Sequence, residues 1–117
     1  MFGDGILVAT AAGSAAYNYA AGGMILPLSA NLLSMTAISP FRPKGWHGAL
    51  IPNDHSIDIA IHNCTVRPGY FTADLQEIYN VTAINIREAK NKQVKLLFNA
   101  ESDLTYKLLT EQFKFCT

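Results

Sequence analysis

The chain has 117 residues, nine of them basic and nine acidic, so its formal net charge at pH 7 is zero. This balance gives no reason to expect a nucleic acid or an anionic membrane surface as a partner. Half of the residues are apolar and only 15% are charged. Because few polar residues are available to cover the outside, we expect a partner or another copy of the chain, in a homo-oligomer, to cover part of the surface.

Cysteine spacing and apolar runs narrow the class of protein further. Cys64 and Cys116 lie far apart and neither belongs to a zinc-ligand pair, which predicts reduced thiols and no metal site. The best apolar stretch, residues 24–33, is interrupted by Pro27 and Asn31 and is too short to span a bilayer. We therefore expect a cytoplasmic protein without a membrane span.

The first predicted elements are a buried strand over residues 6–9, a small-residue turn over 10–13 and a short Ala-rich helix. Ser14 is the expected helix cap, and Gly22 with Gly23 is expected to end the helix. The side chains over residues 11–16 are so small that a purine or a phosphate could approach the main-chain N–H groups, with the aromatic ring of Tyr17 beside them. Tight packing of this segment against a sheet is the alternative interpretation.

The middle of the chain predicts further strands over residues 32–38, 49–51 and 56–61. Between the first two lies a loop, residues 39–48, which carries three potential cations and an indole: Arg42, Lys44, His47 and Trp46. This loop is interpreted either as a charged edge near a phosphate or a subunit contact, or as a rigid surface turn with Trp46 packed at the edge of the core.

The last third predicts a strand over residues 68–73 that ends at Asp74, and an alternating strand over 81–87 paired with 94–98. An amphipathic helix is expected over 103–113. The predicted fold is therefore mainly β: a multistranded antiparallel, sandwich-like domain with a short helix after the first strand and a C-terminal helix.

The first segment resembles the signature of the NAD kinase family, which reads in outline Gly-Asp-Gly, an apolar strand, Thr-Pro-Thr-Gly-Ser-Thr-Ala-Tyr, a few small residues and Gly-Gly-Pro. The residues in register with it are Gly3-Asp4-Gly5, Thr10, Gly13-Ser14, Ala16-Tyr17 and Ala21-Gly22-Gly23. Residues 39–50 are similar to a second family segment, and residues 97–113 resemble the closing segment of some bacterial members.

The resemblance implies that residues 1–117 are the NAD-binding, oligomerising C-terminal domain of such an enzyme. It implies an NAD site lined by Asp4, Ser14, Ala16, Tyr17 and Asp74. Within it, Asp4 would accept a hydrogen bond from an amide, Ala16 would let adenine come close, and Tyr17 would stack or bond alongside. The family's N-terminal α/β domain, with its Gly-Gly-Asp-Gly and Asn-Glu motifs, has no counterpart in these residues, so no catalytic residue is assigned.

The implied function is phosphoryl transfer from ATP or polyphosphate, with Mg²⁺, to the adenosine ribose 2′-hydroxyl of NAD, giving NADP. A separate N-terminal polypeptide would have to supply the missing half. Ala11, Ala12 and Ala15 replace the first Pro, the second Thr and the third Thr of the family signature, and Met24 replaces its last Pro. Losing hydroxyls that would bond NAD favours the alternative, a truncated, non-catalytic relative that acts only as a β-rich oligomerising or binding module. A third hypothesis is a hydrolase that uses Ser14 as its nucleophile. It is disfavoured because the segment lacks the second Gly of a nucleophile elbow.

Overall fold

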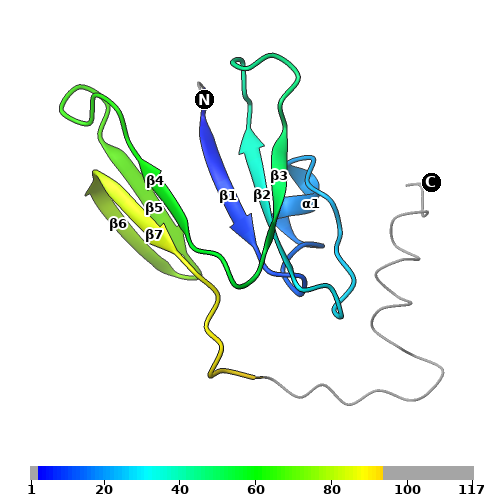
Figure 1. Ribbon diagram of the computed structural model, residues 1–117. Helices are drawn as coiled ribbons and strands as arrows, with labels where there is room; N and C mark the ends of the chain where they lie inside the picture. Colours follow the sequence, from blue (N-terminus) through cyan, green and yellow to red (C-terminus); the bar gives the residue numbers. More distant parts are fainter. Residues whose placement is uncertain (1–2, 94–117) are drawn as a thin grey trace. The chain divides into compact units, whose positions relative to one another are not determined.

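The computed structural model describes residues 3–93 and is mainly β (Figure 1). Its elements are β1 (Gly5–Ala9), α1 (Tyr17–Ala20), β2 (Leu32–Ile38), β3 (Gly48–Pro52), β4 (Ile57–Ala60), β5 (Gly69–Ala73), β6 (Gln76–Val81) and β7 (Ala83–Ile86). Every strand pair among these elements is antiparallel. The predicted mainly β, antiparallel class is confirmed.

The chain divides into two compact units. Of the described residues, the first unit holds 3–53 and 90–93, and the second holds 54–89. No helix within the described part of the chain is long and apolar enough to cross a membrane.

The first unit is built on a three-stranded sheet with β2 in the centre, between β1 and β3. Side chains alternate between the two faces of a strand, so Leu33 and Ala37 share one face of β2 while Ser34 and Thr36 share the other. All four are buried. A strand buried on both faces is expected to be apolar throughout, so Ser34 and Thr36 require hydrogen-bond partners inside the protein.

The predicted helix after the first strand is short, and its predicted cap is wrong. The helix has four residues, its N-cap is Ala16, and no side chain caps it. Residues 11–16 form successive turns instead, in which the N–H groups of Ser14 and Ala16 donate to the carbonyls of Ala11 and Gly13. Ser14 does not act as the cap because α1 begins only at Tyr17 and the Ser14 hydroxyl oxygen accepts from the Leu26 N–H at 2.8 Å rather than from a helix N–H.

The end of this segment agrees with the sequence prediction. Gly22 has a φ of +93°, which glycine adopts without strain. The Gly23 N–H donates to the Asn18 carbonyl at 2.8 Å, so the chain turns away directly after α1.

The second unit contains two two-stranded antiparallel sheets, β4 with β7 and β5 with β6. The strand predicted over residues 81–87 is in fact divided, because Val81 ends β6 and a new strand, β7, begins at Ala83. Ile57 and Ile59 of β4 lie opposite Ile86 and Ile84 of β7, so one face of this pair is apolar. The predicted partner strand over 94–98 and the predicted helix over 103–113 lie outside the described residues.

Strand β6 was not predicted from the sequence. It forms a hairpin with β5, in which Ala73 lies opposite Gln76 and the turn is Asp74-Leu75. Asp74 takes a φ of +53°, a left-handed conformation that Asp and Asn tolerate better than most residues. Asp-Leu is not one of the usual two-residue hairpin turns, so the sequence gives little signal of a hairpin here.

Candidate functional site

The segment that resembles the kinase signature lies on the polar face of β2 and is fixed there by buried hydrogen bonds. In Figure 1, α1 lies beside the sheet formed by β1, β2 and β3. Asn18 of α1 reaches β2, where its side chain meets Ser34 and Thr36. These contacts answer the need for partners that two buried hydroxyls create in the middle of a sheet.

The side-chain amide of Asn18 forms four hydrogen bonds, as many as it can make. Its Nδ2 donates to the carbonyl of Ser14 at 3.1 Å and to that of Met24 at 3.0 Å. Its Oδ1 accepts from Ser34 Oγ at 3.2 Å and from Thr36 Oγ1 at 2.7 Å. Only 1% of Asn18 is exposed. Its amide connects three parts of the chain: the signature loop (residues 10–17), the segment after Gly22 and Gly23, and the central strand β2.

The Ser14 hydroxyl connects Ala11 and Leu26 through hydrogen bonds. It donates to the Ala11 carbonyl and accepts from the Leu26 N–H at 2.8 Å, and the residue is 0% exposed. The hydroxyl is therefore engaged within the protein, and the part of Ser14 that shapes a ligand surface is its main chain.

Gly23 is required by space. A Cβ placed on Gly23 would lie 2.6 Å from Asn18 Cγ and closer still to Asn18 Oδ1 and Thr36 Oγ1. No real Cβ contact is that short, so the pair of hydrogen-bonded side chains can meet only because residue 23 has no side chain.

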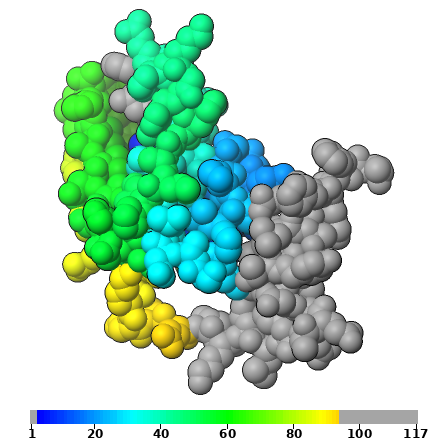
Figure 2. Space-filling model, turned by 45° about the vertical axis from the view of Figure 1, so that its right-hand side comes forward, coloured from blue at the N-terminus to red at the C-terminus, as the bar shows by residue number. Residues whose placement is uncertain are grey.

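On its outer side the same segment presents small and aromatic residues. Ala16 is exposed, and Tyr17 is exposed over 60% of its surface. Part of this segment forms the blue surface in Figure 2. Because Asn18 and Ser14 hold the backbone from below, the exposed Ala16-Tyr17 main chain and the tyrosine ring have a fixed position from which to contact a flat ligand.

The predicted site residues fall into three places. Ser14, Ala16 and Tyr17 lie in one segment, with Ser14 buried beneath the other two. Asp4 lies in the same unit, exposed, directly before β1, where its N–H donates to the Ile38 carbonyl at 2.9 Å. Asp74 lies in the other unit, exposed in the β5–β6 turn.

The loop over residues 39–48 is tied to β2 by its backbone. The Ala37 N–H donates to the His47 carbonyl at 2.8 Å, and Trp46 is half-buried. Arg42, Lys44 and His47 are exposed. The tryptophan thus faces inward more than its neighbours do, while the three potential cations face solvent.

One tyrosine of the second unit has a perturbed pKa. Glu77 raises the pKa of Tyr70, first through hydrogen bonding and then, after desolvation, through its negative charge. The Tyr79 hydroxyl donates to the same carboxylate at 3.1 Å. The Tyr70 ring stacks on Tyr79 across the hairpin, with ring centroids 5.0 Å apart. Neither tyrosine belongs to the predicted site.

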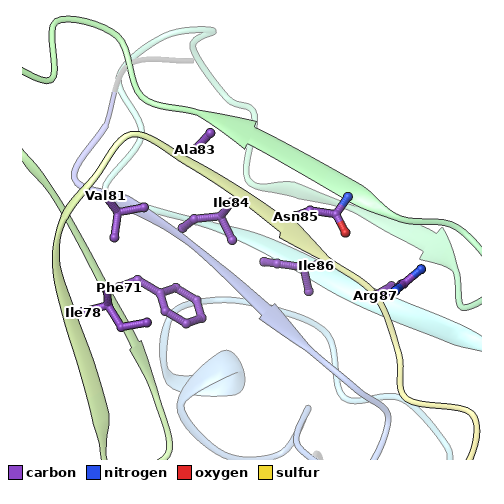
Figure 3. Close-up of a pocket in the computed structure, with 8 residues that line it drawn as sticks. All are labelled: Phe71, Ile78, Val81, Ala83, Ile84, Asn85, Ile86 and Arg87. Carbon is purple, nitrogen blue, oxygen red and sulfur yellow. The ribbon is translucent and has the colours of Figure 1, made fainter.

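A cavity of about 580 Å³ lies in the second unit (Figure 3). Its lining is mainly apolar and comes from the two sheets of that unit: Phe71, Ile78, Val81, Ala83, Ile84, Asn85, Ile86 and Arg87. None of the predicted site residues lines it. Its walls offer no pair of acidic or basic groups for proton transfer, so we assign it no chemistry.

The described residues offer no metal site, since no three His, Cys, Asp or Glu side chains within residues 3–93 come together. Cys64 is a free thiol. A metal-dependent step would therefore need ligands from outside residues 3–93 or from a bound nucleotide.

Sequence reasoning missed the structural centre of this site, Asn18 with Ser34 and Thr36. A signal was present: Ser34 and Thr36 lie at alternate positions of a strand that is otherwise apolar, and Asn18 directly follows the signature Tyr17. Two polar residues on one face of a central strand predict a buried polar partner, although they do not say which residue it is.

Comparison with known proteins extends these observations. The chain is 50% identical over 110 residues to the NAD kinases of Rickettsia bellii (strain OSU 85-389) and Rickettsia prowazekii (strain Madrid E). It is 49% identical over 110 residues to the NAD kinase of Rickettsia typhi. Each match covers 94% of this chain, and the chain spans 43% of the length of each relative. No protein-family model and no solved structure matches.

The matches first define a class: the chain is related to kinases. More specifically, the relatives are NAD kinases, so the resemblance seen in the signature segment is confirmed. The coverage is consistent with a match to a single C-terminal domain of those enzymes.

Proposed function

We propose that residues 1–117 form the NAD-binding, oligomerising C-terminal domain of an NAD kinase. The observation that carries this proposal is the signature loop, which the buried Asn18 holds against β2 and the buried Ser14 bonds to Leu26, while Ala16 and Tyr17 remain exposed. A fixed backbone with minimal side chains beside an aromatic ring suits a flat adenine ring. The NAD kinase relatives support NAD as the ligand.

Each proposed contact has its own role. Ala16 lets adenine approach the main chain, and Tyr17 stacks or bonds beside it. Ser14 acts by holding the loop, because its hydroxyl is engaged with Ala11 and Leu26. Asp4 accepts a hydrogen bond from an amide such as the nicotinamide carboxamide, on the same or a neighbouring subunit. Asp74 is the fifth residue that the resemblance assigns to NAD.

The reaction would transfer a phosphoryl group from ATP or polyphosphate, with Mg²⁺, to the 2′-hydroxyl of the adenosine ribose. Such a transfer needs a carboxylate that positions or deprotonates the hydroxyl, and charge stabilisation on the moving group. Residues 1–117 hold no Gly-Gly-Asp-Gly and no Asn-Glu pair. We therefore propose that these residues are inactive by themselves and act together with an N-terminal α/β half. We further propose that they act in the cytoplasm and form a homo-oligomer.

The second candidate is a non-catalytic oligomerising or binding module. The alanines at positions 12 and 15, where the family signature has Thr, favour it, since each lost hydroxyl bond to NAD would weaken binding by about 0.5–1.5 kcal/mol. The two candidates differ in whether the chain binds NAD, which is the measurement that separates them.

The reaction itself is tested by NADP formation from NAD, ATP and Mg²⁺. We expect no turnover by the 117-residue chain above a heat-treated control, and turnover when a polypeptide carrying Gly-Gly-Asp-Gly and Asn-Glu is added. Steady turnover by the chain alone would contradict the proposal that catalysis needs an N-terminal half. It would require a base among these residues, with Asp4 and Asp74 the first to replace.

A further inference from the structure

We infer that Asn18 is a positioning residue for the NAD surface, and that its two N–H donors, rather than its burial, set the position of the Ala16-Tyr17 backbone. This inference rests on the proposed function and goes beyond it, because Asn18 touches no exposed surface. Its side chain is the point where three segments that are separate in sequence meet.

The oxygen and the nitrogen of the Asn18 amide form hydrogen bonds with different parts of the chain. The Oδ1 side accepts from Ser34 and Thr36, which anchors the residue to the rigid central strand. The Nδ2 side donates to the carbonyls of Ser14 and Met24, which lie at the two ends of the segment that carries Ala16 and Tyr17. Both ends of this segment are therefore hydrogen-bonded to the same amide nitrogen.

The helix itself is too short to hold that position. It has only four residues, with no side-chain cap at its start, and isolated helices of that length are unstable in water. Without the Nδ2 bonds, the backbone around Ala16 would retain the turn hydrogen bonds made by its own neighbours and the bond of the Ser14 hydroxyl to the Leu26 N–H. The placement of the exposed surface thus depends on a buried side chain that never meets the ligand.

Asn18→Asp tests this assignment. The substitution keeps the size of the side chain and the oxygen that faces β2, but it replaces the N–H donors with a second oxygen directed at two carbonyl groups. Ser34→Ala is the matched control, since it removes one hydrogen bond to Oδ1 and leaves both Nδ2 bonds in place. NAD affinity of the full chain is measured by calorimetry at a temperature at which circular dichroism shows each variant to be folded.

We expect the Kd for NAD to rise about tenfold or more in Asn18→Asp and to stay within about twofold of the wild type in Ser34→Ala. The amide protons of Ala16 and Tyr17 should exchange faster in Asn18→Asp only. If Asn18→Asp does not fold, Asn18→Ala is compared with a Ser34→Ala, Thr36→Ala double variant, because both remove the bonds to Oδ1 and only Asn18→Ala also removes the N–H donors.

The outcomes separate this inference from the proposed function. Equal loss of affinity in both variants, or none in either, overturns the positioning role while wild-type binding stands. No NAD binding by the wild type overturns the proposed function and the inference together.

Discussion

Gly23 lies directly against the buried side chains of Asn18 and Thr36. A side chain there would overlap Asn18 and Thr36, which are themselves hydrogen-bonded at 2.7 Å. We expect Gly23→Ala to lower the free energy of unfolding by about 1–3 kcal/mol, the usual cost of overpacking a filled interior. Chemical denaturation of the full chain measures this change.

Gly13→Ala is the control for that measurement, because it adds the same methyl group to the same loop. A Cβ at Gly13 would lie 3.7 Å from Thr10 Oγ1, an ordinary contact distance. Its free energy of unfolding should stay within about 0.5 kcal/mol of the wild type. Equal stability of the two variants would mean that Gly23 is not held against Asn18.

Tyr70 gives a prediction for pH. Because its pKa is raised above the ordinary value of 10.0, the interaction with Glu77 stabilises the fold below pH 10 and is lost as the pH rises through the higher, folded-state pKa. Glu77→Gln removes the negative charge, so the pKa of Tyr70 should fall back toward 10.0. The tyrosinate absorbance of each protein, minus that of its Tyr70→Phe variant, isolates this titration, and an unchanged midpoint in Glu77→Gln would contradict the assignment.

At the residue scale, the sequence predicted where the chain turns better than it predicted what single side chains do. The turn before α1 and the end of α1 at the glycine pair were predicted, since residue size and glycine content are visible in a sequence. The burial of Ser14 and the four bonds of Asn18 were not predicted, because they depend on which strand lies beneath the loop. The roles of Asp4, Ala16, Tyr17 and Asp74 toward NAD stay predictions.

At the scale of single elements, the β5–β6 hairpin depends on the left-handed backbone of Asp74. Asp74→Val should lower the free energy of unfolding by about 1–2 kcal/mol, because a β-branched residue is strained in that conformation. Asp74→Asn keeps the tolerance for a positive φ and removes only the charge, so it should change stability by less than about 0.5 kcal/mol. Thermal unfolding compares the two, and a loss of stability in both would show that the carboxylate, not the turn, is what matters.

Strands were predictable where alternation or a β-branched run is strong. Residues 32–38 and 56–61 predicted β2 and β4 almost to their ends, because their apolar positions repeat at the period of a strand. Strand β6 was missed because all of its residues except Val81 are exposed, so no apolar face marks it. The first helix was predicted too long, since high alanine content favours a helix while the hydrogen bonds of Ser14 impose turns.

At the scale of the whole molecule, the mainly β antiparallel class followed from the number of short alternating segments and their turns. The division into two compact units did not, because no Pro-rich or Gly-rich linker marks residues 53–54 or 89–90. The arrangement of the sheets as a sandwich, the oligomer and the N-terminal partner stay predictions. Relatives that are more than twice as long as this chain are consistent with a site that needs a further domain.

The central claim is that the exposed face of the signature loop binds NAD, and calorimetric titration of NAD into the full chain tests it most directly. We predict saturable binding that Tyr17→Ala weakens about 3- to 10-fold through loss of an aromatic contact. Tyr19→Ala, which truncates an exposed tyrosine of the same helix, should bind like the wild type. No saturable binding by the wild type, or equal binding by all three proteins, would contradict the account.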